Sequence, residues 1–334
     1  DRPRIDYTDS EDGVFLLEKA ATNLVTYSED FSQWSKVNGV VVTDNFTTSP
    51  DGTQNASKLV FDGTNIGRLE LVISASGTNT QSVYLKTESG TQNVSIGAGS
   101  SDLTEHTITD QWVRYTHTGA GNYPRILCND AATIYAWGCQ YESGNIASSY
   151  IPTQGTIQTR VQETASGSGN SEVFSDSQGV LFANISEGYS DNQHKLITIN
   201  DGTNNKVIVI GYDNVVNRVY GEYYNVSSQG RVIFDLTDAT IYTKIALKYD
   251  QTNIYFYVNG FLINQASISS VFSNGDLTQL SFSNGSGSQP FYGKTKEIAY
   301  YDTALTDLEL ETLTSYRTWE EMVKELNLNI IHNE

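Results

Sequence analysis

The stretch Ile254-Tyr255-Phe256-Tyr257-Val258, followed by Asn259-Gly260, indicates the fold class of this 334-residue chain. Side chains alternate between the two faces of a strand, so Ile254, Phe256 and Val258 share one face. Tyr255 and Tyr257 share the other. Asn-Gly is typical of a tight hairpin turn, because both residues tolerate positive φ. The stretch predicts a strand that buries its aliphatic face, directs its tyrosines outward and ends in a turn.

Runs of the same style recur on both sides of this strand. They are rich in Val, Ile, Tyr and Thr and are separated by clusters of Gly, Asn, Asp and Ser, the spacing typical of β-sandwiches. The chain has only 5 prolines, and helix-period segments are nearly absent before residue 300. The clearest runs are Lys58–Phe61, Gln81–Lys86, Gln92–Ile96, Trp112–His117, Ile134–Tyr141, Lys195–Asn200, Lys206–Tyr212, Arg218–Asn225, Arg231–Asp235 and Thr243–Tyr249.

The polar, small-residue stretch Thr164–Asn170 divides the chain, because its composition is that of a flexible connection. We therefore predict an all-β protein of two tandem β-sandwiches with a short C-terminal helical tail. Residues 1–20 are a lead-in with a candidate strand at Val14–Leu17. The expected modules and connections are residues 21–163 for the first sandwich, 164–178 for the linker, 179–315 for the second sandwich and 316–334 for the C-terminal helix.

Two helix signals lie near the C-terminus. Thr306-Asp307-Leu308-Glu309 fits a capping box, and Thr318-Trp319-Glu320-Glu321 repeats it. Helical spacing then predicts one apolar face for Trp319, Met322, Val323 and Leu326. Such a helix would either dock on the second sandwich or contact another subunit.

The charge balance restricts the partners. Twenty basic and 39 acidic residues give a net charge of −19, which disfavours binding to nucleic acid or to anionic lipid. No run has the length of a membrane span, and no signal-peptide pattern opens the sequence. The single methionine is Met322, so we expect the sequence to begin inside a longer protein.

The two cysteines are expected to be free. If Tyr123–Cys128 and Thr133–Tyr141 form a hairpin, Cys128 lies opposite Ile134 and too far from Cys139 for a disulfide. Reduced thiols suit assembly in a reducing cytoplasm.

Catalytic signatures are missing. The sequence contains no nucleophile elbow, phosphate-binding loop or zinc-protease motif, and its four histidines are scattered. We therefore expect no enzyme, although a carboxylate pair for glycoside hydrolysis stays open in so acidic a chain. No cofactor is indicated. Glu29-Asp30, Asp201 and Asp302 are candidate ligands of a structural calcium ion, with solvated turn acids as the alternative.

Outward tyrosines are the candidate ligand-binding groups. Alternation groups Tyr220, Glu222 and Tyr224 on one face of Val219–Val226, as it groups Tyr255 with Tyr257. Tyrosine rings can stack on the C–H face of a sugar while a carboxylate binds its hydroxyls. The alternative is that these tyrosines simply cover the sheet.

The N-terminal half resembles a recurring segment of bacteriophage tail-fibre and related virion proteins, in which it leads into a carbohydrate-binding-module-like jelly roll. The resemblance covers about residues 3–160. It rests on sequence blocks in matching order: Pro3–Tyr7, Gly13–Glu18, Thr22–Phe31 with Trp34, Ser49–Thr53, Asp110–Tyr115, Ile134–Glu142 and Ser149–Thr153.

The second module resembles laminin-G/concanavalin-A-like sandwiches. The resemblance rests on Lys244–Tyr249, Ile254–Gly260, Tyr292–Ile298 and Ala304–Glu309. That fold hosts lectins, enzymes and adhesion modules alike, so it implies a fold and no particular ligand.

Together the resemblances imply a non-enzymatic virion component, a tail fibre or appendage on the virion surface that binds host-surface glycans and is assembled in the host cytoplasm. They imply a homotrimer joined to other virion proteins through a preceding N-terminal part, with no nucleic-acid partner and no membrane insertion. A polysaccharide depolymerase or lyase, and a purely structural decoration, are the alternatives. Given the net charge, we expect a neutral or cationic-group-bearing glycan, or an anionic one bridged by calcium.

Overall fold

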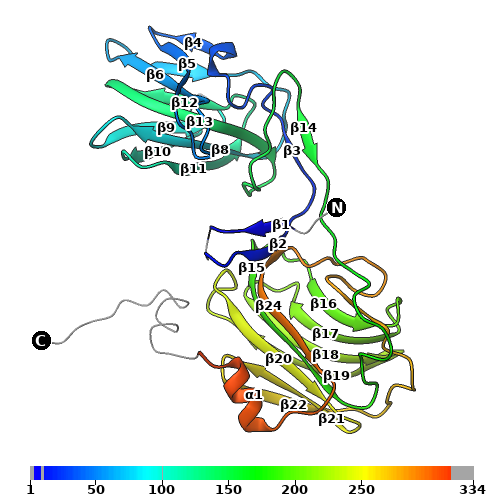
Figure 1. Cartoon of the computed structure of the whole chain (residues 1–334). Helices are drawn as coiled ribbons and strands as arrows, with labels where there is room; N and C mark the ends of the chain where they lie inside the picture. Colours follow the sequence, from blue (N-terminus) through cyan, green and yellow to red (C-terminus); the bar gives the residue numbers. More distant parts are fainter. Residues whose placement is uncertain (1–3, 9–10, 100, 317–334) are drawn as a thin grey trace, which may run out of the picture. The chain divides into compact units, whose positions relative to one another are not determined.

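The computed structural model describes residues 4–8, 11–99 and 101–316 of the chain and divides into two compact units (Figure 1). Unit 1 contains Asp1–Lys19 and Glu163–Glu334, and unit 2 contains Ala20–Gln162. Each unit is a β-sandwich, so the predicted all-β class is confirmed. No helix of the described ranges is both long and apolar enough to cross a lipid bilayer.

Unit 2 has two five-stranded sheets, with strand orders β10-β9-β12-β7-β4 and β11-β8-β13-β6-β5, and a short β14-β3 pair. Its core lies between the sheets and includes Trp34, Leu59, Val83 and Ile126. A 3-10 turn, η1 (Phe31–Gln33), follows β3. The strands are β3 (Ala21–Asn23), β4 (Ser35–Val37), β5 (Val41–Thr47), β6 (Ala56–Asp62), β7 (Gly67–Glu70), β8 (Thr78–Thr87), β9 (Gln92–Gly97), β10 (Leu103–Ile108), β11 (Val113–Ala120), β12 (Arg125–Cys128), β13 (Ala131–Ser143) and β14 (Gln158–Arg160).

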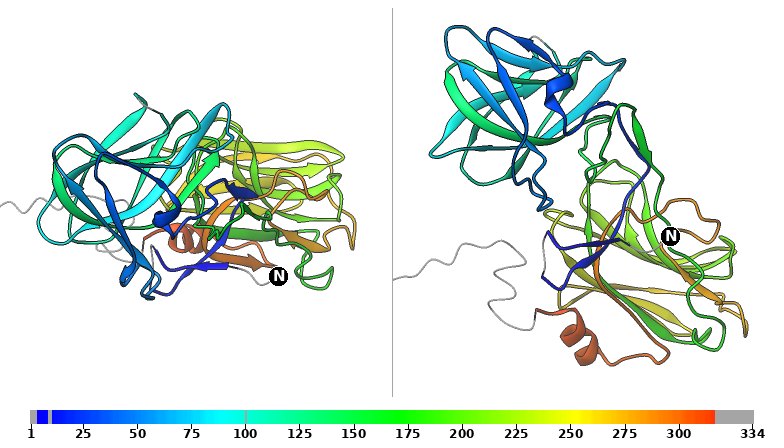
Figure 2. Two further views of the ribbon diagram at one scale, coloured as in Figure 1. Left: turned by 90° about the horizontal axis from the view of Figure 1, so that it is seen from above. Right: turned by 45° about the horizontal axis from the view of Figure 1, so that its top comes forward.

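Unit 1 has a seven-stranded sheet, β1-β2-β24-β15-β20-β21-β22, facing a five-stranded sheet, β19-β18-β17-β16-β23. Figure 2 gives two further views of these layers. Leu181, Ile208, Tyr223 and Phe256 belong to the core between them. The strands are β1 (Arg4–Asp6), β2 (Val14–Leu17), β15 (Gly179–Glu187), β16 (Lys195–Asn200), β17 (Lys206–Tyr212), β18 (Arg218–Asn225), β19 (Ser227–Asp235), β20 (Thr243–Tyr249), β21 (Asn253–Val258), β22 (Phe261–Ser267), β23 (Gln279–Ser281) and β24 (Gly293–Tyr301).

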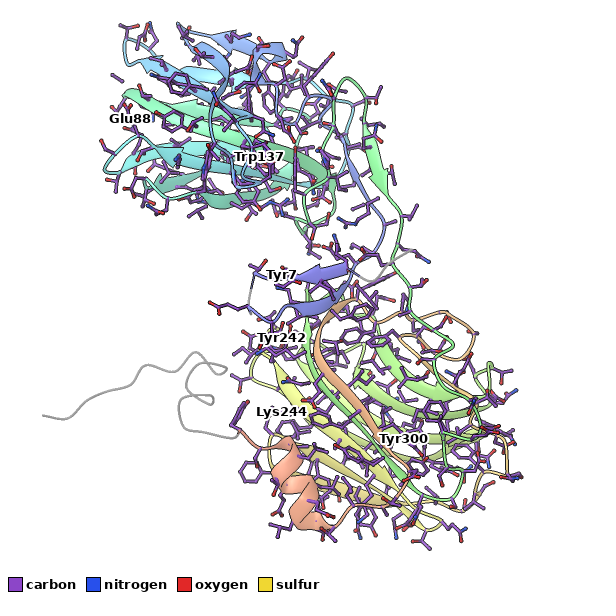
Figure 3. All side chains as sticks on the ribbon, in the orientation of Figure 1. Tyr7, Glu88, Trp137, Tyr242, Lys244 and Tyr300 are labelled. Atoms are coloured by element: carbon purple, nitrogen blue, oxygen red, sulfur yellow. The ribbon has the colours of Figure 1, made fainter. Side chains whose placement is uncertain are left out.

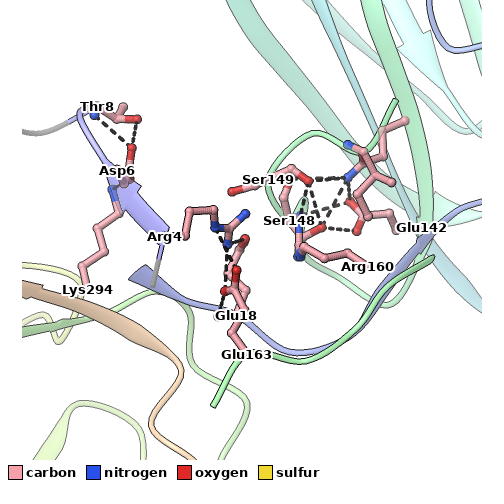
Figure 4. Close-up of polar contacts among 12 residues, drawn as sticks. Arg4, Asp6, Thr8, Glu18, Glu142, Ser148, Ser149, Arg160, Glu163 and Lys294 are labelled. Carbon is pink, nitrogen blue, oxygen red and sulfur yellow. Dashed lines mark hydrogen bonds and ion pairs between the residues drawn. The ribbon is translucent and has the colours of Figure 1, made fainter. Parts of the chain in front are cut away.

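The lead-in, residues 1–20, differs from its prediction as a separate segment. Val14–Leu17 is a strand, but it pairs with β24, and β1 pairs with it in turn, so both extend the sheet of unit 1. Arg4 contacts Glu18 and bonds Glu163 at 3.0 Å, and Lys294 lies 2.7 Å from Asp6 (Figure 4). Unit 2 is therefore inserted in the chain between two parts of unit 1.

Residues 164–178 are not the flexible linker that their composition predicts. Ser168 forms backbone hydrogen bonds with Leu280, and Phe174 is 5% exposed in the core of unit 1. The Ser175 amide donates to the hydroxyl of Tyr300, which is labelled in Figure 3, at 2.8 Å. Small polar residues allow this segment to follow the sheet edges closely, and composition alone does not distinguish that from flexibility.

Cys128 and Cys139 are free and buried, as predicted, but the reason differs from the predicted hairpin. The strand that ends at Cys128, β12, pairs with β7 and β9, whereas β13 pairs with β6 and β8. The turn after Cys128 therefore moves the chain from one sheet to the other. The two thiols belong to opposite layers of the sandwich.

Helix α1 (Asp307–Thr314) confirms the first helix signal. The Glu309 amide donates to Thr306 Oγ1 at 3.3 Å, and the Thr306 amide donates to the Glu309 carboxylate at 2.8 Å, which completes the capping box. The second helix signal, with Trp319, Met322, Val323 and Leu326, lies outside the described residues, as does the predicted helix at 316–334 apart from Tyr316.

Candidate functional site

The predicted alternation along β21 is present. Ile254, Phe256 and Val258 are buried in the core between the sheets, while Tyr255 and Tyr257 belong to a separate cluster on the other face. The face assignment made from the sequence therefore holds. What the sequence did not reveal is what lies over that outer face.

Helix α1 covers the outer face of the seven-stranded sheet, where it contacts β20, β21 and β22 (Figures 1 and 2). Leu310 of the helix is fully buried against Val180, Phe182 and Tyr257. Tyr257 is 0% exposed, and its hydroxyl donates to Asp307 at 2.9 Å. Tyr257 is therefore a packing residue, and its prediction as a ligand-binding group is wrong.

Tyr255 lies beside this cluster and is half-buried. The Lys248 ammonium is 4.8 Å from the centre of its ring. Lys244, further along β20, donates to the Ser315 carbonyl at the end of α1 at 3.0 Å (Figure 3). We call this helix-covered outer surface of β20 and β21 the covered face.

The other three predicted residues, Tyr220, Glu222 and Tyr224, are brought together on β18. Val219 and Tyr223 point into the core, so the alternate residues face outward from the five-stranded sheet. Glu222 is paired with Val209 on one side and Arg231 on the other. We call the outward residues of β16–β19 the open face, because α1 has its contacts on the other sheet.

The open face has an apolar floor beneath polar groups. Leu196, Val207, Val209 and Tyr220 form a small cluster, each less than 7% exposed, with half-buried Tyr224 against it. Ile233 beside Tyr220 is 47% exposed. Tyr220 is only 3% exposed and lies under the Arg231 guanidinium, so it is a packing residue like Tyr257, and its prediction as a ligand-binding group is wrong. Glu222 and Tyr224 are half-buried and keep an outward surface.

Arg231 contacts an aromatic ring and two carboxylates of the open face. Its guanidinium carbon lies 3.9 Å from the centre of the Tyr220 ring, the arrangement of a cation–π contact. One guanidinium nitrogen is 2.9 Å from Asp213 Oδ2, and the other is 3.7 Å from Glu222 Oε2. The arginine is thus fixed between two carboxylates and over an aromatic ring.

His194 lies beside Tyr220 and Asp213. Its ring centre is 5.8 Å from that of Tyr220, and its Nδ1 is 3.5 Å from Asp213 Oδ1. Burial lowers the pKa of His194. Nearby Asp213 raises this pKa and Arg231 lowers it, and the net shift is downward. The imidazole is therefore neutral at pH 7. Burial raises the pKa of the Tyr220 hydroxyl, so it stays protonated.

Chemically, the open face offers one guanidinium, two carboxylates and a half-buried ring within neighbouring strands. It can bind a polar ligand through paired hydrogen bonds to adjacent groups. Across the described parts of the chain, no group of three or more His, Cys, Asp or Glu side chains is arranged to hold a metal ion.

Two of the calcium candidates accept hydrogen bonds from neighbouring residues. Asp201 accepts from Thr203 within its own turn, and Glu29 accepts from Tyr150 and Asn55. Asp302 is exposed.

Sequence reasoning missed Arg231, Asp213 and His194. Arg231 stands at the start of a predicted strand, and a cross-strand partner for Glu222 could have been sought there. The register that pairs them includes an irregularity between Tyr223 and Tyr224, which the sequence does not reveal.

No protein-family model matches the chain, and no curated protein matches its sequence. Solved structures give partial, weak similarities. The CBM40 of the Ruminococcus gnavus IT-sialidase, bound to α2,3 sialyllactose, is 18% identical over 46% of this chain and 97% of its own, with a TM-score of 0.38.

Two further structures are similar to the same extent. Domain 4 of the arabinanase AbnA from Geobacillus stearothermophilus, in complex with arabinotriose, is 14% identical over 48% of this chain and 73% of its own, with a TM-score of 0.36. NanB sialidase from Streptococcus pneumoniae is 12% identical over 44% of this chain, with a TM-score of 0.36, and only 25% of its length is spanned.

Proposed function

We propose that the chain is a non-enzymatic, glycan-binding component of a phage virion, a tail fibre or comparable appendage, and that the open face binds the glycan. The observation that carries the proposal is the Arg231 guanidinium, stacked on Tyr220 and placed between Asp213 and Glu222. The phage context is supported by the sequence blocks of residues 3–160 that resemble tail-fibre proteins.

The chemistry of a sugar fits this arrangement. Adjacent hydroxyls both donate and accept, so they can bond a carboxylate and a guanidinium at the same time. The C–H face of the ring can lie on Tyr224 at the edge of the apolar floor. An anionic sugar would have to compete with two carboxylates for Arg231, and the chain carries a net charge of −19, so we propose a neutral host-surface glycan.

The proposal includes a homotrimer at the virion surface, supported by the tail-fibre resemblance alone. Linking three weak sites on one particle would raise the avidity by a factor of about 10²–10⁴ over a single site. Light scattering of the purified chain measures its oligomeric state directly.

The test is a glycan array probed with the full chain and with Arg231→Lys, which keeps the charge but removes the planar group that stacks on Tyr220. We expect binding to one class of neutral glycan and a clear loss in the variant. Each bound glycan is then incubated with the protein and assayed for new reducing ends or unsaturated products. New products would show that the protein is a depolymerase and not a simple binder. An array without any signal would favour the hypothesis of a purely structural decoration.

A further inference from the structure

Unit 2 contains a polar cavity that the proposed function does not use. Its volume is about 690 Å³, within the range of roughly 300–1,000 Å³ that small-molecule sites occupy. Four segments line it: Glu29–Asp30, Asp44–Asn45, residues 151–154 and residues 158–160. All four belong to unit 2, so the cavity is internal to one compact unit.

The carboxylates of the cavity are held in place by their neighbours. The Tyr150 hydroxyl donates to Glu29 Oε1 at 2.9 Å, and the Asn55 amide donates to Glu29 Oε2 at 3.0 Å. Ser57 Oγ donates to Asp44 Oδ1 at 2.7 Å. A carboxylate can accept about four hydrogen bonds, so both retain acceptor capacity toward the cavity.

Asp30 is fixed as the N-cap of η1, where its Oδ1 accepts from the Ser32 amide at 3.1 Å. Partial burial raises the pKa of Asp30, but the hydrogen bonds from Ser32 and Gln33 outweigh it, and the net shift is downward. Asp30 is therefore ionised at neutral pH.

Other lining groups are also held in place by hydrogen bonds. Thr153 is 7% exposed, and its amide donates to Ser28 Oγ at 2.8 Å. Arg160 donates to the Ser149 carbonyl at 3.0 Å (Figure 4), and its strand β14 pairs with β3. Exposed Gln154 and Gln158 add amide donors and acceptors at the rim. A ligand would meet these groups without a large rearrangement.

The lining selects the chemistry of the ligand. Three carboxyl groups, those of Glu29, Asp30 and Asp44, stand against the one guanidinium of Arg160, and Asp30 and Asp44 share a hydrogen bond. Even with one proton shared between them the lining is net negative, which disfavours an anion. None of the eleven lining residues is aromatic, so ring stacking contributes nothing here. Carboxylate acceptors together with amide donors match the paired donor and acceptor character of sugar hydroxyls.

We propose that this cavity is a second carbohydrate site, one that binds a neutral sugar unit by hydrogen bonds from its hydroxyls to Glu29 and Asp44. It goes beyond the open face, because it lies in the other unit and uses no aromatic ring. The two sites are separable by mutation, and either can exist without the other.

The experiment is ligand-observed NMR and calorimetry on the full chain. The probes are neutral hexoses and their disaccharides, with glucuronate, glucosamine and calcium chloride as separate arms. Asp44→Asn removes one charge at nearly constant shape, and Gln158→Ala removes a rim amide. Asp110→Asn, an exposed carboxylate elsewhere in unit 2, is the matched control, and Arg231→Lys reports on the open face.

We expect a neutral sugar to bind and Asp44→Asn to weaken that binding by about tenfold or more, as for loss of a hydrogen bond to a charged group. Gln158→Ala should weaken it less, and the Asp110 and Arg231 variants should leave it unchanged. The proposal is overturned if no neutral sugar binds, if Asp44→Asn and Gln158→Ala both bind like the wild type, or if only calcium or glucosamine binds. Loss in Arg231→Lys alone would assign the binding to the open face instead.

Discussion

The covered face and the open face of unit 1 carry the same sequence pattern and have different structures. On β21, Tyr255 and Tyr257 alternate with core residues, and on β18, Tyr220 and Tyr224 do so. Helix α1 buries Tyr257 completely, whereas the groups around Tyr220 are an arginine, two carboxylates and a histidine. Alternation determines which face a tyrosine occupies, and a partner element distant in the sequence determines whether that face can meet a ligand.

The largest effect expected from this difference concerns the two tyrosines of β21. Tyr257→Ala should destabilise the protein by about 3–5 kcal/mol, because it empties a fully buried site beneath α1. Tyr255→Ala should cost clearly less, since Tyr255 is half-buried. Urea unfolding of the two variants measures the contrast. Equal losses would mean that α1 does not seal the face as described.

The next largest effect on stability is expected from Leu310, on the side of α1 that packs on the sheet. Leu310→Ala should cost about 2–5 kcal/mol, because Leu310 is fully buried against Phe182 and Tyr257. Leu308, on the same helix, is 73% exposed, so Leu308→Ala should change stability by no more than about 0.5 kcal/mol. Thermal unfolding followed by circular dichroism distinguishes them. A similar cost for both would contradict the orientation of α1.

The capping box should give a smaller, pH-dependent effect. Thr306→Ala should destabilise by about 0.5–2 kcal/mol at neutral pH, since it removes the N-cap of α1. Hydrogen bonds from the Thr306 amide and hydroxyl lower the pKa of Glu309 below its ordinary value of 4.5. The carboxylate contribution is therefore present above that value and is lost as the pH falls through the folded-state pKa.

Unfolding of wild type and Thr306→Ala at pH 7 and pH 3 tests this sign. The stability difference between the two proteins should shrink at the lower pH. A difference that grows with acidity would mean that Glu309 acts elsewhere.

The open face should contribute little to stability. Arg231→Lys should cost about 1 kcal/mol, because lysine keeps the positive charge beside buried Asp213 and loses only the planar contact with Tyr220. Its effect on glycan binding should nevertheless be clear, so that stability and binding respond to opposite faces. If Arg231→Lys lost much stability and kept its glycan binding, the open face would be a packing surface and not a binding surface.

The local pattern of strands could be predicted, and their pairing could not. Val14–Leu17 was recognisable as a strand. Its place beside β24 depends on the pairing of Phe15 with Thr295, and in the sequence all of unit 2 lies between these two residues. The same holds for Cys128, where one turn changes sheets. A sequence pattern reports the two faces of one strand, and long-range pairing is set by the packing of whole layers.

The candidate site was predictable to the same degree. Tyr220, Glu222 and Tyr224 were found because they lie on one strand with a period of two. Arg231 lies within β19 and Asp213 directly after β17, on either side of β18, so they meet only through the sheet register. Tyr257 was misassigned because Leu310, which covers it, belongs to an element whose docking no local pattern specifies.

The most direct test of the central claim is a matched pair of tyrosine variants, one on each face. Binding of the full chain to its array-selected glycan is measured by calorimetry for Tyr224→Ala and for Tyr255→Ala, with unfolding curves to confirm that both are folded. The account predicts that Tyr224→Ala weakens binding and that Tyr255→Ala leaves it unchanged, because only Tyr224 lies on the open face. Loss of binding in Tyr255→Ala with full binding in Tyr224→Ala would contradict it.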